Sequence, residues 1–112
     1  MSAVVREATA ISDPEGVETA ATALYEEFED DDRPATAPED LGGELLGAVR
    51  TLDPEGDEPA AWAAAAAAVW LATNPSQSDQ GDHVLREGAR LVFEGKPPEP
   101  LSRWLAERGV QV

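Results

Sequence analysis

The chain has 112 residues, of which 23 are acidic and 8 are basic, so its formal net charge at pH 7 is -15. This negative field repels phosphate backbones and anionic lipid surfaces, so we expect neither direct nucleic-acid binding nor association with a membrane. The chain contains no cysteine, which excludes disulfides, thiolate zinc sites and cysteine nucleophiles, and its length suits a single helical domain over residues 1–112.

The beginning of the chain contains two helical patterns of different strength. Apolar residues recur at helical spacing over residues 2–11 without a strong N-cap, so residues 1–12 are expected to be a frayed helix or an arm. The next pattern is better defined, because Asp13 can cap a helix and Pro14 suits a first position that needs no N–H donor. An apolar stripe then predicts a helix that ends near Glu29.

The next segment combines an acidic loop with a third helical pattern. The run EFEDDDRPATAPED has no apolar periodicity and is punctuated by proline, which predicts a solvated loop. Thr36 and Glu39 have the spacing of a capping box, and apolar residues follow at helical spacing up to Leu52. Three glycines fall in this helix, at Gly42, Gly43 and Gly47. Each weakens it by up to about 1 kcal/mol relative to alanine, which indicates either close helix contact or a flexible first turn.

The tetrapeptide DPEG occurs twice, at residues 13–16 and 53–56, each time before an alanine-rich run. The two copies are not expected to act alike. A helix capped by Asp53 would contain Pro59, which removes a hydrogen bond and clashes with the preceding turn. We therefore predict a turn at residues 53–56, a new N-cap at Asp57 and Pro59 in the first turn of the following helix.

Residues 60–73 form the strongest helical pattern of the chain, because alanine has the highest intrinsic helix propensity and the run contains no breaker. Its alanines bury little area but let neighbouring backbones approach closely, as expected for the central helix of a bundle. Two shorter helices follow. The first is capped at Asp79 or Asp82 and ends at Gly95, and the second covers residues 100–108 and is stopped by Gly109.

Together these patterns predict an all-α fold, a compact bundle of four or five short helices joined by acidic, proline-rich loops. The first residues, MSAVVREATAISDPEG, lack a basic segment followed by a long apolar one, as a secretory signal would have. The run AAWAAAAAAVWLA is too short to cross the roughly 30 Å hydrocarbon core of a bilayer. We therefore expect a cytoplasmic protein.

The kinds of charged residue also carry information, since Lys96 is the only lysine among the 8 basic residues. Abundant carboxylates, scarce lysine and much alanine resemble the proteins of salt-in halophiles, notably haloarchaea; this is a likeness of composition and not of family. At about 1 M salt the Debye length is only about 3 Å, so surface carboxylates no longer repel one another and still hold water and cations. We expect non-specific cations at the acidic surface.

Two groups of residues could bind a metal ion. On a helix, Asp79, His83 and Glu87 would lie on one face, where they could hold a divalent cation. The alternative, which we favour, is that His83 lies in an exposed first turn beside carboxylates that are common throughout this chain. The acidic run at residues 26–32 lacks the ligand spacing and central glycine of an EF-hand loop. No cofactor and no resident metal are therefore expected.

Catalytic motifs are missing from the sequence. Ser76, Ser78 and Ser102 fall in loop or cap positions, and no GxSxG pattern occurs. The glycine-rich stretch LGGELLG follows no strand and lacks the lysine of a phosphate-binding loop. We do not expect an enzyme.

The three tryptophans are the largest side chains of an alanine-rich sequence, and their simplest role is to fill the core. The functional alternative is that one of them, together with neighbouring leucines, buries against another chain, because tryptophan is enriched at interface hot spots. The candidate interface residues are Trp62, Trp70, Trp104, Leu101 and Leu105.

Three hypotheses for function follow. The first is a non-enzymatic module for protein–protein interaction or for self-association as a homodimer, in a halophile. The alternative is an acidic regulator that binds the basic surface of a nucleic-acid-binding protein, with YEEFEDDD as a phosphate mimic. The third is a metal-dependent activity around His83.

Overall fold

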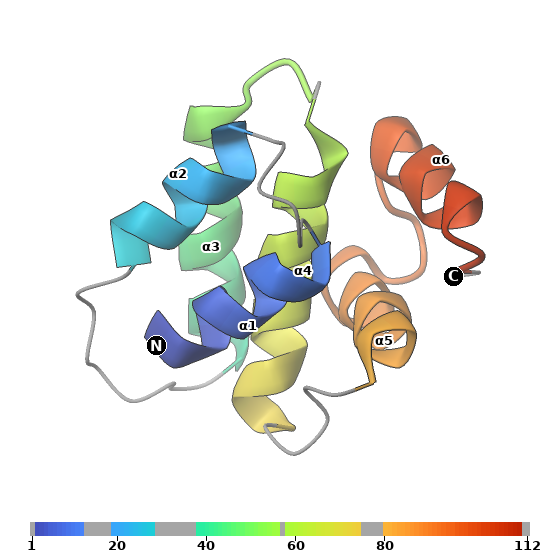
Figure 1. Cartoon of the computed structure of the whole chain (residues 1–112), viewed down its shortest axis with the longest axis horizontal. Coiled ribbons are helices and arrows are strands. Elements are labelled where there is room, and N and C mark those ends of the chain that lie inside the picture. The colour runs from blue at the N-terminus through green and yellow to red at the C-terminus, as the bar shows by residue number, and fades with distance from the viewer. Residues whose placement is uncertain (1, 13–18, 29–37, 57, 75–79, 111–112) are drawn as a thin grey trace.

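The computed structural model describes residues 2–12, 19–28, 38–56, 58–74 and 80–110, which form six α-helices and no strand (Figure 1). The helices are α1 (Ser2–Ser12), α2 (Thr19–Phe28), α3 (Pro38–Leu52), α4 (Pro59–Thr73), α5 (Gly81–Phe93) and α6 (Glu99–Glu107). The predicted all-α class is confirmed. None of the helices in the described part of the chain has the length and hydrophobicity that a transmembrane span requires.

The predicted number of four or five helices was too low, and α1 is the reason. Neither end of this helix carries charges that favour the helix dipole, so its sequence lacks the usual local signals. Its apolar face is fully buried at Val5 and Ala8, and α1 packs against α4. Burial in the bundle stabilises this helix, and a contact with a segment far along the chain cannot be seen in local sequence.

Helix α4 lies at the centre of the bundle, as predicted, and contacts each of the other five described helices (Figure 1). Almost every side chain along it is buried, so no face is polar. Its buried residues are Ala60, Ala61, Ala63, Ala64, Ala65, Ala66, Ala67, Ala68, Val69 and Leu71. Short alanine side chains on every side allow helices to pack around α4 at close range.

Helix α5 comes closest to α4 at Gly88. A Cβ atom at this position would lie 2.6 Å from the carbonyl oxygen of Ala66 and 2.8 Å from its carbonyl carbon, which is closer than real Cβ contacts. Gly88 is therefore required by packing and not by backbone conformation. Gly43 and Gly47 on α3 differ, since both are exposed and a Cβ there would meet no atom within 4 Å. The expected close helix contact is wrong for these two glycines.

Two helix ends are formed by backbone that turns left-handed. At the end of α5, Glu94 and Gly95 have φ values of 55° and 81°. At the end of α6, Gly109 has a φ of 77° and donates its N–H to the Ala106 carbonyl at 3.0 Å. The Val110 N–H then bonds the Leu105 carbonyl at 2.9 Å, which is the Schellman pattern. The predicted stop at Gly109 is confirmed.

Several predicted helix starts and loops lie outside the described residues. They are the caps at Asp13, Thr36, Asp57 and Asp79, and the acidic, proline-rich loop at residues 29–37. Asp82, the other candidate cap of α5, lies inside the first turn of that helix. The N-cap position of α5 is occupied by Gln80.

We expect Gly88→Ala and Gly47→Ala to change stability in opposite directions. The first forces a methyl group against the α4 backbone and should lower the free energy of unfolding by about 1–3 kcal/mol. The second adds helix propensity in open space and should raise it by up to about 1 kcal/mol. Denaturant unfolding followed by circular dichroism in molar KCl measures both. Equal stability of the two variants would contradict the close approach of α5 to α4.

Candidate binding groove

The segment between α3 and α4 forms a tight turn, as predicted for residues 53–56. The Gly56 N–H donates to the Asp53 carbonyl at 3.2 Å, and Gly56 adopts a φ of 73°, which suits glycine. Asp53 itself is only 5% exposed, and its N–H still bonds the Val49 carbonyl of α3 at 2.8 Å. The end of α3 and the turn are therefore joined through one buried acidic residue.

The buried carboxylate of Asp53 also organises the start of α4. Its Oδ2 atom accepts the Glu58 N–H at 2.9 Å and the Trp62 indole Nε1–H at 3.0 Å. A carboxylate at this end of α4 also complements the positive end of the helix dipole. Pro59 occupies the first turn of α4, as predicted. The carboxylate therefore holds the indole ring of Trp62 against the turn.

A groove runs between this turn and α6. It consists of two adjoining hollows of about 210 Å³ and 350 Å³, and Gly56 and Pro100 line both. The other residues of the first hollow are Pro54, Glu55, Trp62, Pro98 and Leu101. The other residues of the second are Pro59, Arg103, Trp104 and Glu107. We call the two hollows together the Trp groove.

Helix α6 is fixed by leucines on its core-facing side and by an arginine at its C-terminal end. Leu101 and Leu105 are each 1% exposed and belong to the core. The Arg108 guanidinium lies over the Trp104 ring, 4.6 Å from its centroid, and donates a hydrogen bond to the Ile11 carbonyl at 3.2 Å. These contacts tie Trp104 to α1, so both tryptophans of the Trp groove are anchored to other parts of the fold.

The charges at the rim of the Trp groove are of both signs. Glu55 borders the first hollow, and Arg103 and Glu107 border the second. Arg103 is ion-paired with Glu99, at 2.8 Å between Nη2 and Oε1. Within the described part of the chain, neither Glu55 nor Glu107 takes part in an ion pair. The uncompensated rim charge is therefore negative.

The five candidate interface residues are thus divided between several environments. Trp62 and Trp104 line the Trp groove, and Leu101 also contributes to its lining. Leu105 is buried on the core-facing side of α6. Trp70 lies apart from them, with its ring edge-on to the His83 ring at 6.0 Å between centroids. A role in binding another chain stays a prediction for each of these residues.

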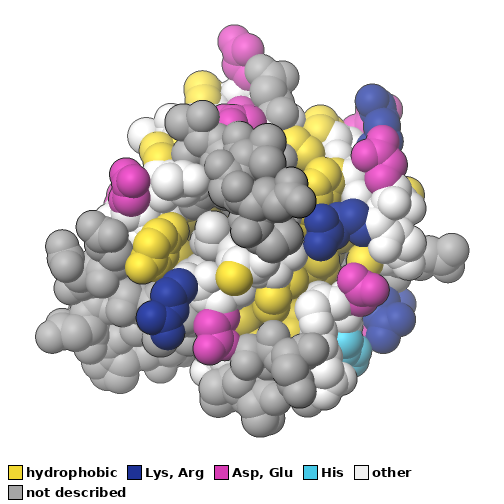
Figure 2. All heavy atoms as spheres, viewed as in Figure 1, with side chains coloured by type: hydrophobic (Ala, Val, Ile, Leu, Met, Phe, Trp, Pro, Cys, Tyr) yellow, Lys and Arg dark blue, Asp and Glu magenta, His cyan; other side chains and the backbone are white. Residues whose placement is uncertain are grey.

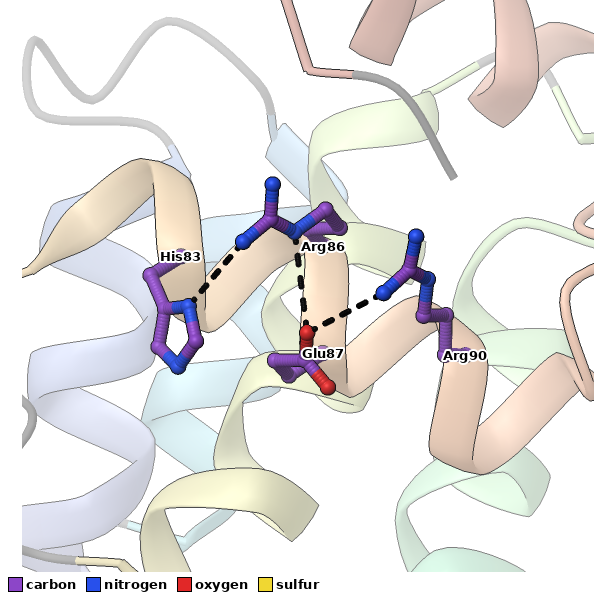
Figure 3. A network of polar contacts seen from close by, with 4 residues as sticks. All are labelled: His83, Arg86, Glu87 and Arg90. Atoms are coloured by element: carbon purple, nitrogen blue, oxygen red, sulfur yellow. Dashed lines mark hydrogen bonds and ion pairs between the residues drawn. The ribbon is translucent and has the colours of Figure 1, made fainter.

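Two of the three candidate metal ligands, His83 and Glu87, lie in the described part of the chain. Asp79 lies outside the described residues, and the other two candidates contact arginines (Figure 3). The His83 Nδ1 atom is 3.3 Å from Arg86 Nη2, and Glu87 Oε1 lies 3.3 Å from Arg90 Nη1 and 3.6 Å from Arg86 Nε. A guanidinium can only donate, so Nδ1 accepts and is occupied. Among the residues that the structure describes, no cluster of three or more possible ligands occurs.

The acidic segment YEEFEDDD is only partly described. Its first residues belong to α2, where Glu26 and Glu27 are exposed and Tyr25 is half-buried against the core. On the face shown in Figure 2, acidic and basic side chains of the described residues are interspersed, and apolar side chains gather near the middle of the view. This face offers no continuous acidic surface among the side chains that are coloured.

Sequence reasoning identified the two tryptophans of the Trp groove but not the groove. It did not identify Asp53, which supplies a buried acceptor for both a backbone N–H and the indole of Trp62. A usable signal was present. An aspartate in a turn shortly before a proline-started helix, with a tryptophan in the first turns of that helix, has suitable partners within reach.

Similarity to known proteins does not assign a role to the Trp groove. Searches against protein families, curated proteins and solved structures gave no match to this chain. A function therefore has to be argued from the geometry and chemistry of the groove itself.

We expect Asp53→Ala to lower the free energy of unfolding by about 2 kcal/mol, because it leaves a backbone N–H and an indole N–H without their acceptor. Trp62→Phe keeps an aromatic ring and removes one donor, so it should cost less, about 1 kcal/mol. The two changes share one hydrogen bond, so the double variant should cost less than their sum. Denaturant unfolding of all four proteins measures the coupling, and strict additivity would contradict it.

Proposed function

We propose that this protein is a non-enzymatic protein–protein interaction module that binds a segment of another protein in the Trp groove. The observation that carries the proposal is the lining, in which two tryptophans and four prolines surround a pair of adjoining hollows. Tryptophan is enriched at binding hot spots because its large, rigid ring buries much area and loses little side-chain entropy.

The way the groove is built supports binding without a large rearrangement. Trp62 is hydrogen-bonded to the buried Asp53, and Trp104 lies under Arg108 on a helix that is anchored by buried leucines. Side chains that are already held in one position reduce the ordering cost of binding. The described lining contains carboxylates and one arginine but no serine, threonine, lysine or histidine, a set that suits contact better than nucleophilic catalysis.

We also propose that the protein works at high salt, on the strength of its halophile-like composition. At about 1 M salt the Debye length falls to about 3 Å, so long-range attraction between proteins is screened. Apolar contact is not weakened in this way. An apolar groove is therefore a better basis for recognition in that solvent than an acidic surface, which makes the Trp groove a better candidate than the acidic regulator hypothesis.

The proposal predicts a partner that depends on the Trp groove. Pro100→Glu places a charge where the two hollows meet, and it suits the first turn of α6 because a carboxylate there favours the helix dipole. The control is Leu91→Glu on α5, an exposed side chain (46%) that does not line the groove. In pull-downs in molar KCl, we expect the same partner with wild type and the control, and about tenfold less with Pro100→Glu.

Sedimentation of the same proteins identifies the kind of partner. A dimer that forms with wild type and is lost with Pro100→Glu would show that the second chain is another copy. Recovery of identical proteins with wild type and both variants would contradict a role for the Trp groove, as would a wild-type protein that stays monomeric and recovers no partner.

A further inference from the structure

We propose that the segment bound in the Trp groove is extended, contains proline and carries lysine or arginine next to its prolines. This inference rests on the proposed function, because it specifies the chemistry of the partner at the same site. Three features of the described residues support it: the arrangement of the two hollows, the pairing of a tryptophan with prolines in each, and the sign of the rim charge.

The arrangement of the hollows suits an extended chain. They adjoin at Gly56 and Pro100, and a Cβ atom on Gly56 would have no atom within 4 Å, so the passage between them is open. An extended chain can cross this passage and place side chains in both hollows.

Each hollow presents one indole ring beside proline rings. Trp62 lies with Pro54 and Pro98 in the first hollow, and Trp104 lies with Pro59 in the second. Grooves lined by aromatic side chains recognise polyproline II segments, whose rings pack on the aromatic faces and whose backbone is extended before binding. The occupant therefore loses little conformational entropy, and the anchored tryptophans lose little as well.

The rim charge selects a basic occupant. Glu55 and Glu107 border the two hollows, and neither takes part in an ion pair among the described residues. The charge of Arg103 is compensated by Glu99. The Arg108 guanidinium lies over the Trp104 ring and donates a hydrogen bond to the Ile11 carbonyl of α1. Lysine or arginine beside the prolines of a partner would contact the rim carboxylates directly, at distances where screening by salt is weakest.

Charge also argues against a second copy of this chain as the occupant. Two stretches of the chain combine prolines with a basic residue. EDDDRPATAPED has one arginine among many carboxylates, and EGKPPEP has one lysine between two glutamates and already lines the Trp groove at Pro98 and Pro100. Such a segment would meet Glu55 and Glu107 with charge of the same sign, which disfavours association. A different protein with basic, proline-containing sequence is the better match.

The test is a titration of the full chain with three synthetic peptides of equal length. In the first, arginines alternate with pairs of prolines; in the second, glutamates replace the arginines; in the third, alanines replace the prolines. Tryptophan fluorescence and calorimetry measure affinity in the lowest KCl concentration that keeps the helices formed by circular dichroism. We expect the first peptide to bind at least about tenfold more tightly than either of the others.

Two charge variants separate the rim from the overall charge of the protein. Glu55→Lys with Glu107→Lys should abolish the preference for the basic over the acidic peptide. Glu26→Lys with Glu27→Lys changes the net charge equally, on exposed positions of α2 that do not line the Trp groove, and should keep the preference. Raising the KCl concentration should reduce the preference of wild type for the basic over the acidic peptide. It should not change the preference for the peptide with prolines over the peptide with alanines.

The outcomes distinguish this inference from the proposed function. A partner that is lost with Pro100→Glu but binds through a helical or proline-free segment would overturn the inference and leave the interaction module in place. Equal affinity of wild type for all three peptides, or a preference that only the Glu26→Lys and Glu27→Lys pair removes, would also overturn it. Failure of Pro100→Glu to reduce any association would instead count against the proposed function.

Discussion

The close approach of α5 to α4 at Gly88 is the contact on which the rest of the bundle depends. Helix α4 is built almost entirely of alanine, so each of its side chains buries little apolar area. Such a helix is stabilised when neighbouring helices pack near its backbone, and a Cβ at position 88 would stand only 2.6 Å from the Ala66 carbonyl oxygen. The buried side chains Val84, Leu85 and Ala89 of α5 join the same core.

The position of α4 also determines where the Trp groove can form. Its first turns carry Trp62, and the turn before it supplies Asp53, whose buried carboxylate links the end of α3 to the start of α4. Helix α6 lies against the same end, with Leu101 and Leu105 in the core and Trp104 toward the groove. The groove is therefore a consequence of core packing.

Local signals predicted part of this structure well. The turn at residues 53–56, the stop at Gly109 and the central role of α4 followed from proline geometry, from glycine at positive φ and from alanine propensity. Helix α1 lacks caps, so its sequence predicts only a frayed helix or an arm, and its stability comes from contact with α4. Gly43, Gly47 and Gly88 all fall within predicted helices. Only the packing of the helices shows that Gly43 and Gly47 are exposed and that Gly88 is buried.

Composition and local pattern are enough to predict the helical class, the central helix, the acidic character and the absence of cysteine chemistry, because propensity and capping act over a few neighbouring residues. Which tryptophans share a site depends instead on how the helices pack. Trp62 and Trp104 line the two adjoining hollows of the Trp groove, whereas the Trp70 ring lies edge-on to the His83 ring. The physical reason is that side chains far apart along the chain are brought together by helix packing, which depends on close contacts such as the one at Gly88 and on no local pattern.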